Sequence, residues 1–227
     1  MASIANALLQ IQKKIAPSKL NINEDELKSQ MARLGSGSAC RSTINGWVLW
    51  GETPLINASS NHYGVSVNEK VHPIFNDLQD SILVIRKGIK AVSSSVGHQL
   101  MDEHPYRDGR IKQANTNIDI LLKALKSGNF NAFAEVCESE AMSLHALMMS
   151  SSPSYTLLAP ESLLAIKRIK EIRKHYHLPL TFTLDAGPNV HLIYPKDQSK
   201  AIVAFIEEYL KPLCENEEVI YDHISVK

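Results

Sequence analysis

Apolar residues recur at helical spacing over long parts of the chain. Residues 2–13, ASIANALLQIQK, place Ala, Leu and Ile three to four positions apart, which predicts a helix with one apolar face. A second helix is expected from Asn23, because Asn can cap a helix and Glu26 follows three positions on, as in a capping box. Gly35 closes this helix, and the helical pattern returns from about Val96 to Tyr176.

The stretch between Val96 and Tyr176 divides into successive helices. Apolar positions are spaced helically over 111–128 and again over 129–150, and the sequence SPSY at 152–155 interrupts the pattern. A further helix is predicted over 160–176, since Pro stands in its first turn and cations in its last, as the preferences of helix ends require.

Short apolar runs predict the strands. We expect strands at Gly46–Gly51, Ser81–Arg86, Thr181–Leu184, Val190–Tyr194 and near Val219–Tyr221, with a turn-rich segment between the first two and a helix over Gln198–Leu210. Helices followed by strand, turn, strand, helix and strand are typical of an α+β fold with a largely antiparallel sheet. The helices of 96–176 should pack on one sheet that contains 81–86, 181–184 and 190–194.

Composition excludes several classes of function. The 227 residues are 44% hydrophobic and 21% charged, which is ordinary for a globular protein of one large or two small domains. The formal net charge is zero, so no basic field attracts nucleic acid or a membrane surface. No apolar run is long enough to span a bilayer, and the N-terminus lacks the charged start of a signal peptide.

Cysteine and histidine usage gives no disulfide framework and no metal site. Cys40, Cys137 and Cys214 are scattered and form no C-x-x-C pair, which indicates a reduced, cytosolic setting. The nine histidines show no metal-ligand spacing. His145 stands among Leu and Met on a predicted helix and is interpreted as a core or site-wall residue rather than a ligand.

The stretch ARLGSGSACRS, Ala32–Ser42, is the strongest chemical signal. Glycines and serines alternate over 35–38, so backbone N–H groups and hydroxyls can approach an anion. Residues 39–43 could begin a helix whose N-terminus faces the same anion, and Arg41 adds a planar cation suited to carboxylate or phosphate. A flexible linker between helices explains the stretch equally well.

A second hydroxyl-rich stretch, KAVSSSVGH at Lys90–His98, lies between a predicted strand and a predicted helix. Three serines at this place can hold an anion. They can also simply cap the following helix, and the residues alone favour that second interpretation.

Asp185 stands where an apolar strand, TFTL, meets a Gly-Pro-Asn turn. The acid can serve as a turn former. Alternatively, the fold holds its carboxylate at the rim of a sheet, where it can meet a substrate hydroxyl. The stretch itself leaves both interpretations open.

Taken together and in order, these three stretches and SLHALMMSSSPSYTLL at 143–158 resemble the diphosphomevalonate decarboxylase family of the GHMP kinase superfamily. The resemblance covers about residues 20–210. It implies a GHMP kinase-like α+β fold, an antiparallel sheet covered by helices. It also implies that residues 1–75 are the remainder of the N-terminal domain and 76–227 the C-terminal α+β domain.

The resemblance further implies ATP-dependent decarboxylation of mevalonate 5-diphosphate to isopentenyl diphosphate, phosphate and CO2. Asp185 would orient or deprotonate the C3 hydroxyl as it attacks the γ-phosphate of ATP. Arg41 would grip the substrate carboxylate with a bidentate pair. Ser36 and Ser38 match the family's serines at the substrate, and Ser94 matches a serine that contacts the diphosphate. Asp185 and Arg41 should then converge on one cleft.

Two departures from the family qualify this picture. Some members carry Arg or Thr where this chain has Ser95, so the grip on the diphosphate differs. The family also begins with a strand and a P-x-x-x-G-[LI]-A-S-S-A loop that cradles ATP, whereas Met1–Ala5 resembles the helix after that loop. We therefore expect an incomplete N-terminal domain and weak or no ATP binding, with ATP and Mg²⁺ required by the complete enzyme.

Three functions remain open at this point. The first is the decarboxylase, expected as a cytoplasmic homodimer. The second is a truncated, non-catalytic family member that binds an anionic metabolite or only dimerises. The third is a related kinase that stops at the 3-phosphate. The presence of both Asp185 and Arg41 favours the decarboxylase over the kinase, and the missing ATP loop favours the non-catalytic member.

Overall fold

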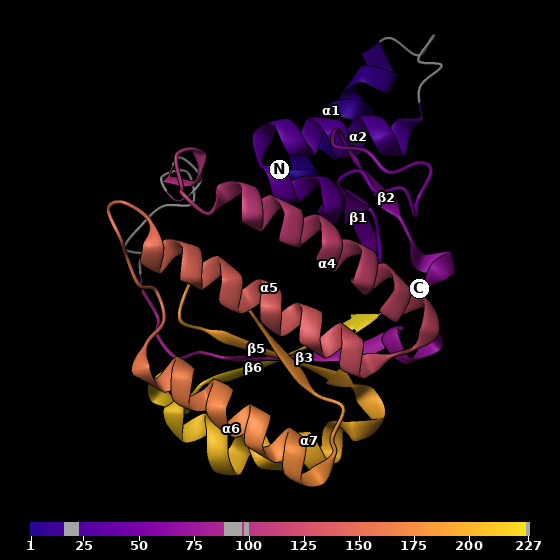
Figure 1. Cartoon of the computed structure of the whole chain (residues 1–227). Coiled ribbons are helices and arrows are strands. Elements are labelled where there is room, and N and C mark those ends of the chain that lie inside the picture. The colour runs from indigo at the N-terminus through magenta and orange to yellow at the C-terminus, as the bar shows by residue number, and fades with distance from the viewer. Residues whose placement is uncertain (16–22, 89–96, 98–99, 226–227) are drawn as a thin grey trace. The chain divides into compact units, whose positions relative to one another are not determined.

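The computed structural model describes residues 1–15, 23–88, 97 and 100–225. These residues form two compact units, one within Met1–Val71 and the other within His72–Ile224. Figure 1 identifies their helices and strands.

The first unit begins with helices α1 (Ala2–Ile15) and α2 (Glu24–Gly35), close to the predicted ranges. The Asn23 side chain caps α2, as predicted, by accepting a hydrogen bond from the Asp25 backbone N–H at 3.1 Å. In a capping box Glu26 would accept a hydrogen bond from the Asn23 backbone N–H. Here it accepts instead from the Asn23 side-chain amide, at 3.2 Å. A 3₁₀-helix, Gly37–Thr43, follows directly, where helical structure was expected at 39–43.

A small antiparallel sheet completes this unit. It pairs β1 (Val48–Trp50), inside the predicted strand at 46–51, with β2 (Gly64–Ser66). The sequence did not predict β2, because three residues beginning with glycine are too short to show an apolar alternation. Gly64 is required there, since a Cβ at this position would lie 2.8 Å from Cγ1 of Val48.

The second unit is built on one four-stranded sheet. Its strands are β3 (Asp77–Leu83), β4 (Thr181–Leu184), β5 (Val190–Pro195) and β6 (Val219–Ser225), in the order β4-β5-β3-β6. β5 pairs antiparallel with both β3 and β4. The prediction that the strands at 81–86, 181–184 and 190–194 share one sheet is therefore confirmed. β3 starts earlier than expected, because polar and apolar residues mix over its first half.

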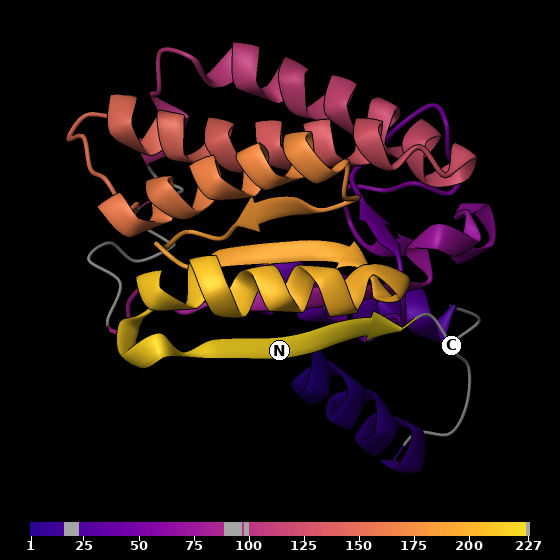
Figure 2. The ribbon, with the colours of Figure 1, turned by 90° about the horizontal axis from the view of Figure 1, so that it is seen from below.

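In the described part of this unit, four α-helices flank the sheet. They are α4 (Arg107–Ser127), α5 (Phe130–Ser150), α6 (Pro160–Tyr176) and α7 (Ser199–Phe205), the last continuing as a π-helical turn over Ile206–Leu210. Figure 1 shows α4 and α5 on one side of the sheet and α6 and α7 on the other, and Figure 2 shows the same ribbon from below. The α+β class and the helix-covered antiparallel sheet are as predicted.

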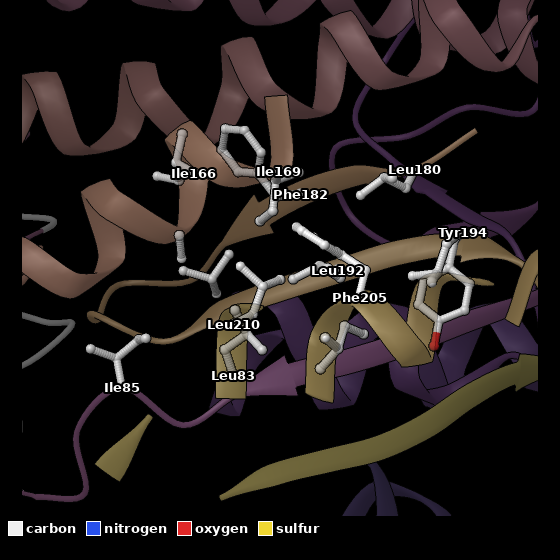
Figure 3. Packing of buried hydrophobic residues seen from close by; sticks show 14 of the residues in the cluster. Leu83, Ile85, Ile166, Ile169, Leu180, Phe182, Leu192, Tyr194, Phe205 and Leu210 are labelled. Carbon is white, nitrogen blue, oxygen red and sulfur yellow. The ribbon is translucent and has the colours of Figure 1, made fainter. Parts of the chain in front are cut away.

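The main core fills the space between the sheet and the helices α6 and α7. Because side chains alternate along a strand, Leu83, Phe182 and Leu192 point to the same face of the sheet. They pack with Ile169 of α6 and Phe205 of α7 (Figure 3). This core fixes the sheet, and with it the strand ends that carry the candidate site.

The opposite face of the sheet carries polar groups. The alternation places Asp80 of β3, His191 of β5 and Thr183 of β4 on this face, together with Thr181. Thr181 is fully buried and its hydroxyl hydrogen-bonds to the Glu138 carboxylate of α5 at 3.2 Å. A polar row on an otherwise apolar sheet is a candidate for function rather than packing.

Candidate functional site

The 3₁₀-helix of the first unit carries three of the predicted substrate-binding residues. Ser36 immediately precedes the helix, and Ser38 and Arg41 lie within it. A 3₁₀-helix has about three residues per turn, so residues three apart lie above one another. Ser38 and Arg41 therefore share one side of the helix, and all three side chains are exposed.

Buried contacts hold this helix in place. The Ser29 hydroxyl of α2 donates to the Cys40 carbonyl at 2.8 Å and accepts from the Gly64 N–H of β2 at 2.8 Å. Cys40 is fully buried, and burial raises the pKa of its thiol. Gly37 is required beside Trp50, since a Cβ there would lie 2.9 Å from the Trp50 ring.

The exposed groups on the helix are available to a ligand. Within the described residues, no hydrogen bond or ion pair engages the guanidinium of Arg41 or the hydroxyls of Ser36 and Ser38. A rigid backbone thus presents a planar cation and a hydroxyl on one side, which suits a carboxylate or phosphate oxygen.

Asp185 lies in the second unit, one residue beyond β4, where its side chain is exposed. It borders a pocket of about 380 Å³. The pocket is lined by the turn that follows Asp185, by the chain segment after β3 and by part of the segment before α6: Arg86, Lys87, Gly88, Thr156, Leu157, Asp185, Ala186, Gly187, Pro188, Asn189 and His191.

The turn DAGPN is held from several directions. The Asp185 carbonyl accepts hydrogen bonds from the Gly187 N–H at 2.7 Å and from Nε2 of His145 on α5 at 3.1 Å. The Pro188 carbonyl accepts from the Ser162 hydroxyl of α6 at 2.5 Å. The turn is therefore anchored to two helices, which is more than a simple connection between two strands needs.

A third anchor comes from the strand segment beside the turn. The Asn189 side-chain oxygen accepts the Arg86 N–H at 3.1 Å, just beyond the end of β3. The bond links the last residue of the turn to the segment after β3, and both line the pocket.

His145 is 1% exposed. Burial lowers its pKa more than the nearby Asp185 raises it, so its neutral form is favoured. A neutral imidazole carries a single N–H. Because a backbone carbonyl can only accept, the bond to Asp185 selects the tautomer with its proton on Nε2. The sequence left His145 as either a core or a site-wall residue, and the buried ring fits the core, since it does not line the pocket.

A histidine in the pocket wall was not identified from the sequence. Nδ1 of His191 lies 3.0 and 3.2 Å from the two carboxylate oxygens of Asp80 on the neighbouring strand. This hydrogen bond is the main reason that the pKa of His191 is raised. Only the pairing register brings the two residues together, since they stand more than a hundred positions apart.

The remaining charges that line the pocket are paired. Arg86 forms an ion pair with Glu161 at 2.9 Å. A backbone hydrogen bond at Glu161 and, after it, the hydrogen bond from Arg86 lower the pKa of this half-buried carboxyl. Lys87 forms an ion pair with Glu218. The pocket therefore combines ion-paired cations with the carboxylate of Asp185.

Not every predicted site residue can be placed. Ser94, and almost all of the stretch Lys90–His98, lie outside the described residues. Arg41 belongs to the first unit and Asp185 to the second, and their convergence stays a prediction. Among the residues that the structure covers, no three His, Cys, Asp or Glu side chains form a group that could hold a metal ion. No helix in the same part of the chain is long and apolar enough to cross a membrane.

Known protein families match both parts of the chain. Residues 81–226, more than half of the sequence, match the family described as mevalonate 5-diphosphate decarboxylase C-terminal domain. Residues 1–61 match the diphosphomevalonate decarboxylase-like N-terminal domain.

Curated relatives carry the same name. The diphosphomevalonate decarboxylase of Ganoderma lucidum is 31% identical over 207 residues, which covers 87% of this chain and 50% of the relative. The enzyme of that name from Saccharomyces cerevisiae is 28% identical over 181 residues, which covers 78% of this chain and 45% of the relative. The chain thus spans about half the length of the curated relatives it matches.

Solved structures share the fold. Mevalonate diphosphate decarboxylase from Staphylococcus aureus matches 89% of this chain and 59% of its own, with a TM-score of 0.74 and 26% identity. The enzyme from Legionella pneumophila matches 96% of this chain and 64% of its own, with a TM-score of 0.81. At 23% identity the latter supports the fold alone. These matches confirm the GHMP kinase-like fold, and the chain belongs to the mevalonate 5-diphosphate decarboxylase family.

Proposed function

We propose that this chain carries the substrate-binding and proton-accepting groups of an ATP-dependent decarboxylase that converts mevalonate 5-diphosphate to isopentenyl diphosphate, phosphate and CO2. The observation that carries the proposal is the anchored turn after β4. Three separate segments bond to the DAGPN turn, and it borders a pocket. Relatives that share these parts of the chain carry the decarboxylase name.

Asp185 is proposed as the group that receives the substrate hydroxyl. A carboxylate within hydrogen-bond reach of the C3 hydroxyl orients its oxygen and can accept its proton as that oxygen takes a phosphoryl group from ATP. The phosphorylated oxygen then leaves as phosphate, and the electrons of the bond to the carboxylate form the new double bond as CO2 departs. The fixed charge of Asp185 would stabilise the positive character that develops at C3.

Arg41, Ser36 and Ser38 are proposed to hold the acidic end of the substrate. The guanidinium of Arg41 makes no contact within the described residues that would compete with a bidentate pair to a carboxylate. Ser38 shares its side of the 3₁₀-helix. Ser94 keeps its proposed contact to the diphosphate.

ATP is proposed as co-substrate together with Mg²⁺, as the family resemblance implies. A related solved structure, a complex with MVAPP, AMPPCP and magnesium, supports this. The described residues offer no cluster of three possible metal ligands, so this part of the chain does not fit a protein-held magnesium site. Weak ATP binding by this chain stays a prediction, which calorimetric titration with ATP tests.

The assembly and location are also proposals. We propose a homodimer in the cytoplasm. The described cysteines form no disulfide, and partial burial raises the pKa of the Cys137 thiol to about 12, which keeps it unreactive. Light scattering after size-exclusion chromatography measures the mass, and a monomer at micromolar concentration would contradict the dimer.

Substrate binding tests the proposed function directly. Calorimetry with mevalonate 5-diphosphate should show binding to the 227-residue chain, and Arg41→Gln should weaken it about tenfold or more, because a bidentate charged pair is lost. Arg107→Gln is the matched control, since Arg107 lies exposed on α4 and does not line the pocket. Equal affinities for the native chain and Arg41→Gln would contradict the role of Arg41.

A further inference from the structure

His191 lies in a row of charged groups that crosses three strands. In the sheet register, His191 is opposite Ile82 on β3 and Thr183 on β4. Asp80 stands two positions from Ile82 and is a diagonal neighbour of His191 on the same face. Asp185 follows the end of β4, and its charge is close enough to help raise the pKa of His191. An imidazole thus lies between the two acids, and Asp185 bears the proposed chemistry.

The hydrogen bond to Asp80 determines which ring nitrogen is left for a ligand. Both carboxylate oxygens of Asp80 approach Nδ1, at 3.0 and 3.2 Å. Nδ1 therefore carries its proton toward Asp80, and Nε2 is the remaining ring nitrogen. Within the described residues Nε2 makes no hydrogen bond, and the ring lines the pocket with 26% of its side chain exposed.

The charges around His191 favour its protonated form. Asp80 faces it from β3 and Asp185 from the turn after β4. Arg86 and Lys87, which line the same pocket, are paired with Glu161 and Glu218. The Asp80 hydrogen bond is the largest influence and raises the pKa of His191, which partial burial alone would lower. The protonated ring has a donor at Nε2 as well as at Nδ1.

We propose that the Asp80–His191 pair is a further substrate-facing element of this pocket, in which the Nε2–H of His191 donates a hydrogen bond to an oxyanion of the bound substrate beside Asp185. The proposal rests on the proposed function. Asp80 acts as a positioning residue, because it fixes the orientation and protonation of the ring without reaching the substrate. A carboxylate and a phosphate both offer the required acceptor.

Calorimetry with mevalonate 5-diphosphate at several pH values tests the proposal. His191→Gln should weaken binding at pH 6 about tenfold or more, because a charged hydrogen bond is lost. His191→Lys should retain most of the affinity, since it keeps a cation. His175→Gln is the matched control, an exposed histidine of the same unit at the end of α6.

The pH dependence separates a charged donor from a merely structural ring. The affinity of the native chain, relative to that of His191→Gln, should fall as the pH rises through the pKa of His191. Asp80→Asn should move this fall to lower pH, because the raised pKa depends mainly on Asp80. Comparing the two proteins at each pH cancels the titration of the substrate's own phosphates.

Fragments of the substrate identify the acceptor. Mevalonate offers a carboxylate and no phosphate, and inorganic pyrophosphate offers phosphate alone. If His191→Gln weakens the binding of only one of these fragments, the oxyanion of that fragment is the one that Nε2 binds. If His191→Gln bound the substrate and both fragments as the native chain does while Arg41→Gln did not, the proposal for His191 would be overturned and the proposed function would stand. If the native chain bound no mevalonate 5-diphosphate, the proposed function itself would fail.

Discussion

Asp185 is the residue on which the proposed chemistry depends most. Asn has the same size and keeps one acceptor, so contacts with the ground-state substrate largely survive Asp185→Asn. The negative charge matters only as the hydroxyl gives up its proton and C3 becomes electron-poor. We therefore expect kcat to fall about 10²–10⁴-fold with KM nearly unchanged, measured by phosphate release in a protein that joins this chain to the family's ATP-loop segment.

Arg41→Lys should behave differently from Asp185→Asn. Lys keeps the charge but loses the planar fork that binds a carboxylate through two hydrogen bonds. The substrate is then held less firmly and less accurately, so KM should rise and kcat should fall together. Steady-state kinetics in the same fusion protein measure both. An unchanged KM would show that Arg41 does not bind the substrate.

The anchored turn is the element that connects fold to function. Ser162 is fully buried at the start of α6, where its hydroxyl donates to Pro188 and accepts from the Ala159 N–H at 3.2 Å. Ser162→Ala removes both bonds with little change in volume. We expect a loss of about 1–3 kcal/mol in the free energy of unfolding, measured by urea denaturation of the 227-residue chain.

The same variant should also disturb the position of Asp185. Its kcat in the fusion protein should fall while substrate affinity changes little, because Ser162 touches the turn and not the ligand. Ser199→Ala provides a matched control, since among the described residues the Ser199 hydroxyl bonds only to the Lys196 carbonyl, away from the pocket. A stability loss with full activity would mean that the bond to Pro188 supports packing alone.

Long periodic elements could be predicted from the sequence, and short or paired ones could not. The helices α4, α5 and α6 show their apolar spacing over many turns, and β4 and β5 are short, largely apolar runs on either side of a turn. β2 spans three residues and shows no alternation. Its existence depends on pairing with β1, which no local pattern records.

The residues of the candidate site also fall into those that the sequence could predict and those that it could not. Asp185, Arg41 and Ser38 stand in stretches whose residue types indicate chemistry. His191 looks like one more position in an apolar strand, and only the sheet register shows that it faces Asp80. His145 was expected as a core or site-wall residue, but its bond to the Asp185 carbonyl follows from the packing of α5 beside the end of β4.

At the scale of the whole molecule, the Asp80–His191 pair should make stability depend on pH. The pKa of His191 is raised in the folded chain, so the pair contributes its full stability below the unfolded pKa of about 6.5. That contribution is lost as the pH rises through the folded pKa. The free energy of unfolding should therefore fall more between pH 6 and pH 9 for the native chain than for His191→Gln, as urea denaturation measures. Parallel curves for the two proteins would contradict a raised pKa.

Release of labelled CO2 tests the central claim most directly. The substrate is mevalonate 5-diphosphate labelled at its carboxyl carbon, supplied with ATP and Mg²⁺ to the protein that joins this chain to the family's ATP-loop segment. We predict that the native sequence releases CO2 in step with phosphate. Asp185→Asn should bind the substrate with nearly native affinity but release both CO2 and phosphate far more slowly than the native sequence. Substrate binding without CO2 from the native sequence would identify a non-catalytic family member, and phosphate transfer without CO2 would identify a kinase. Either result would contradict the account.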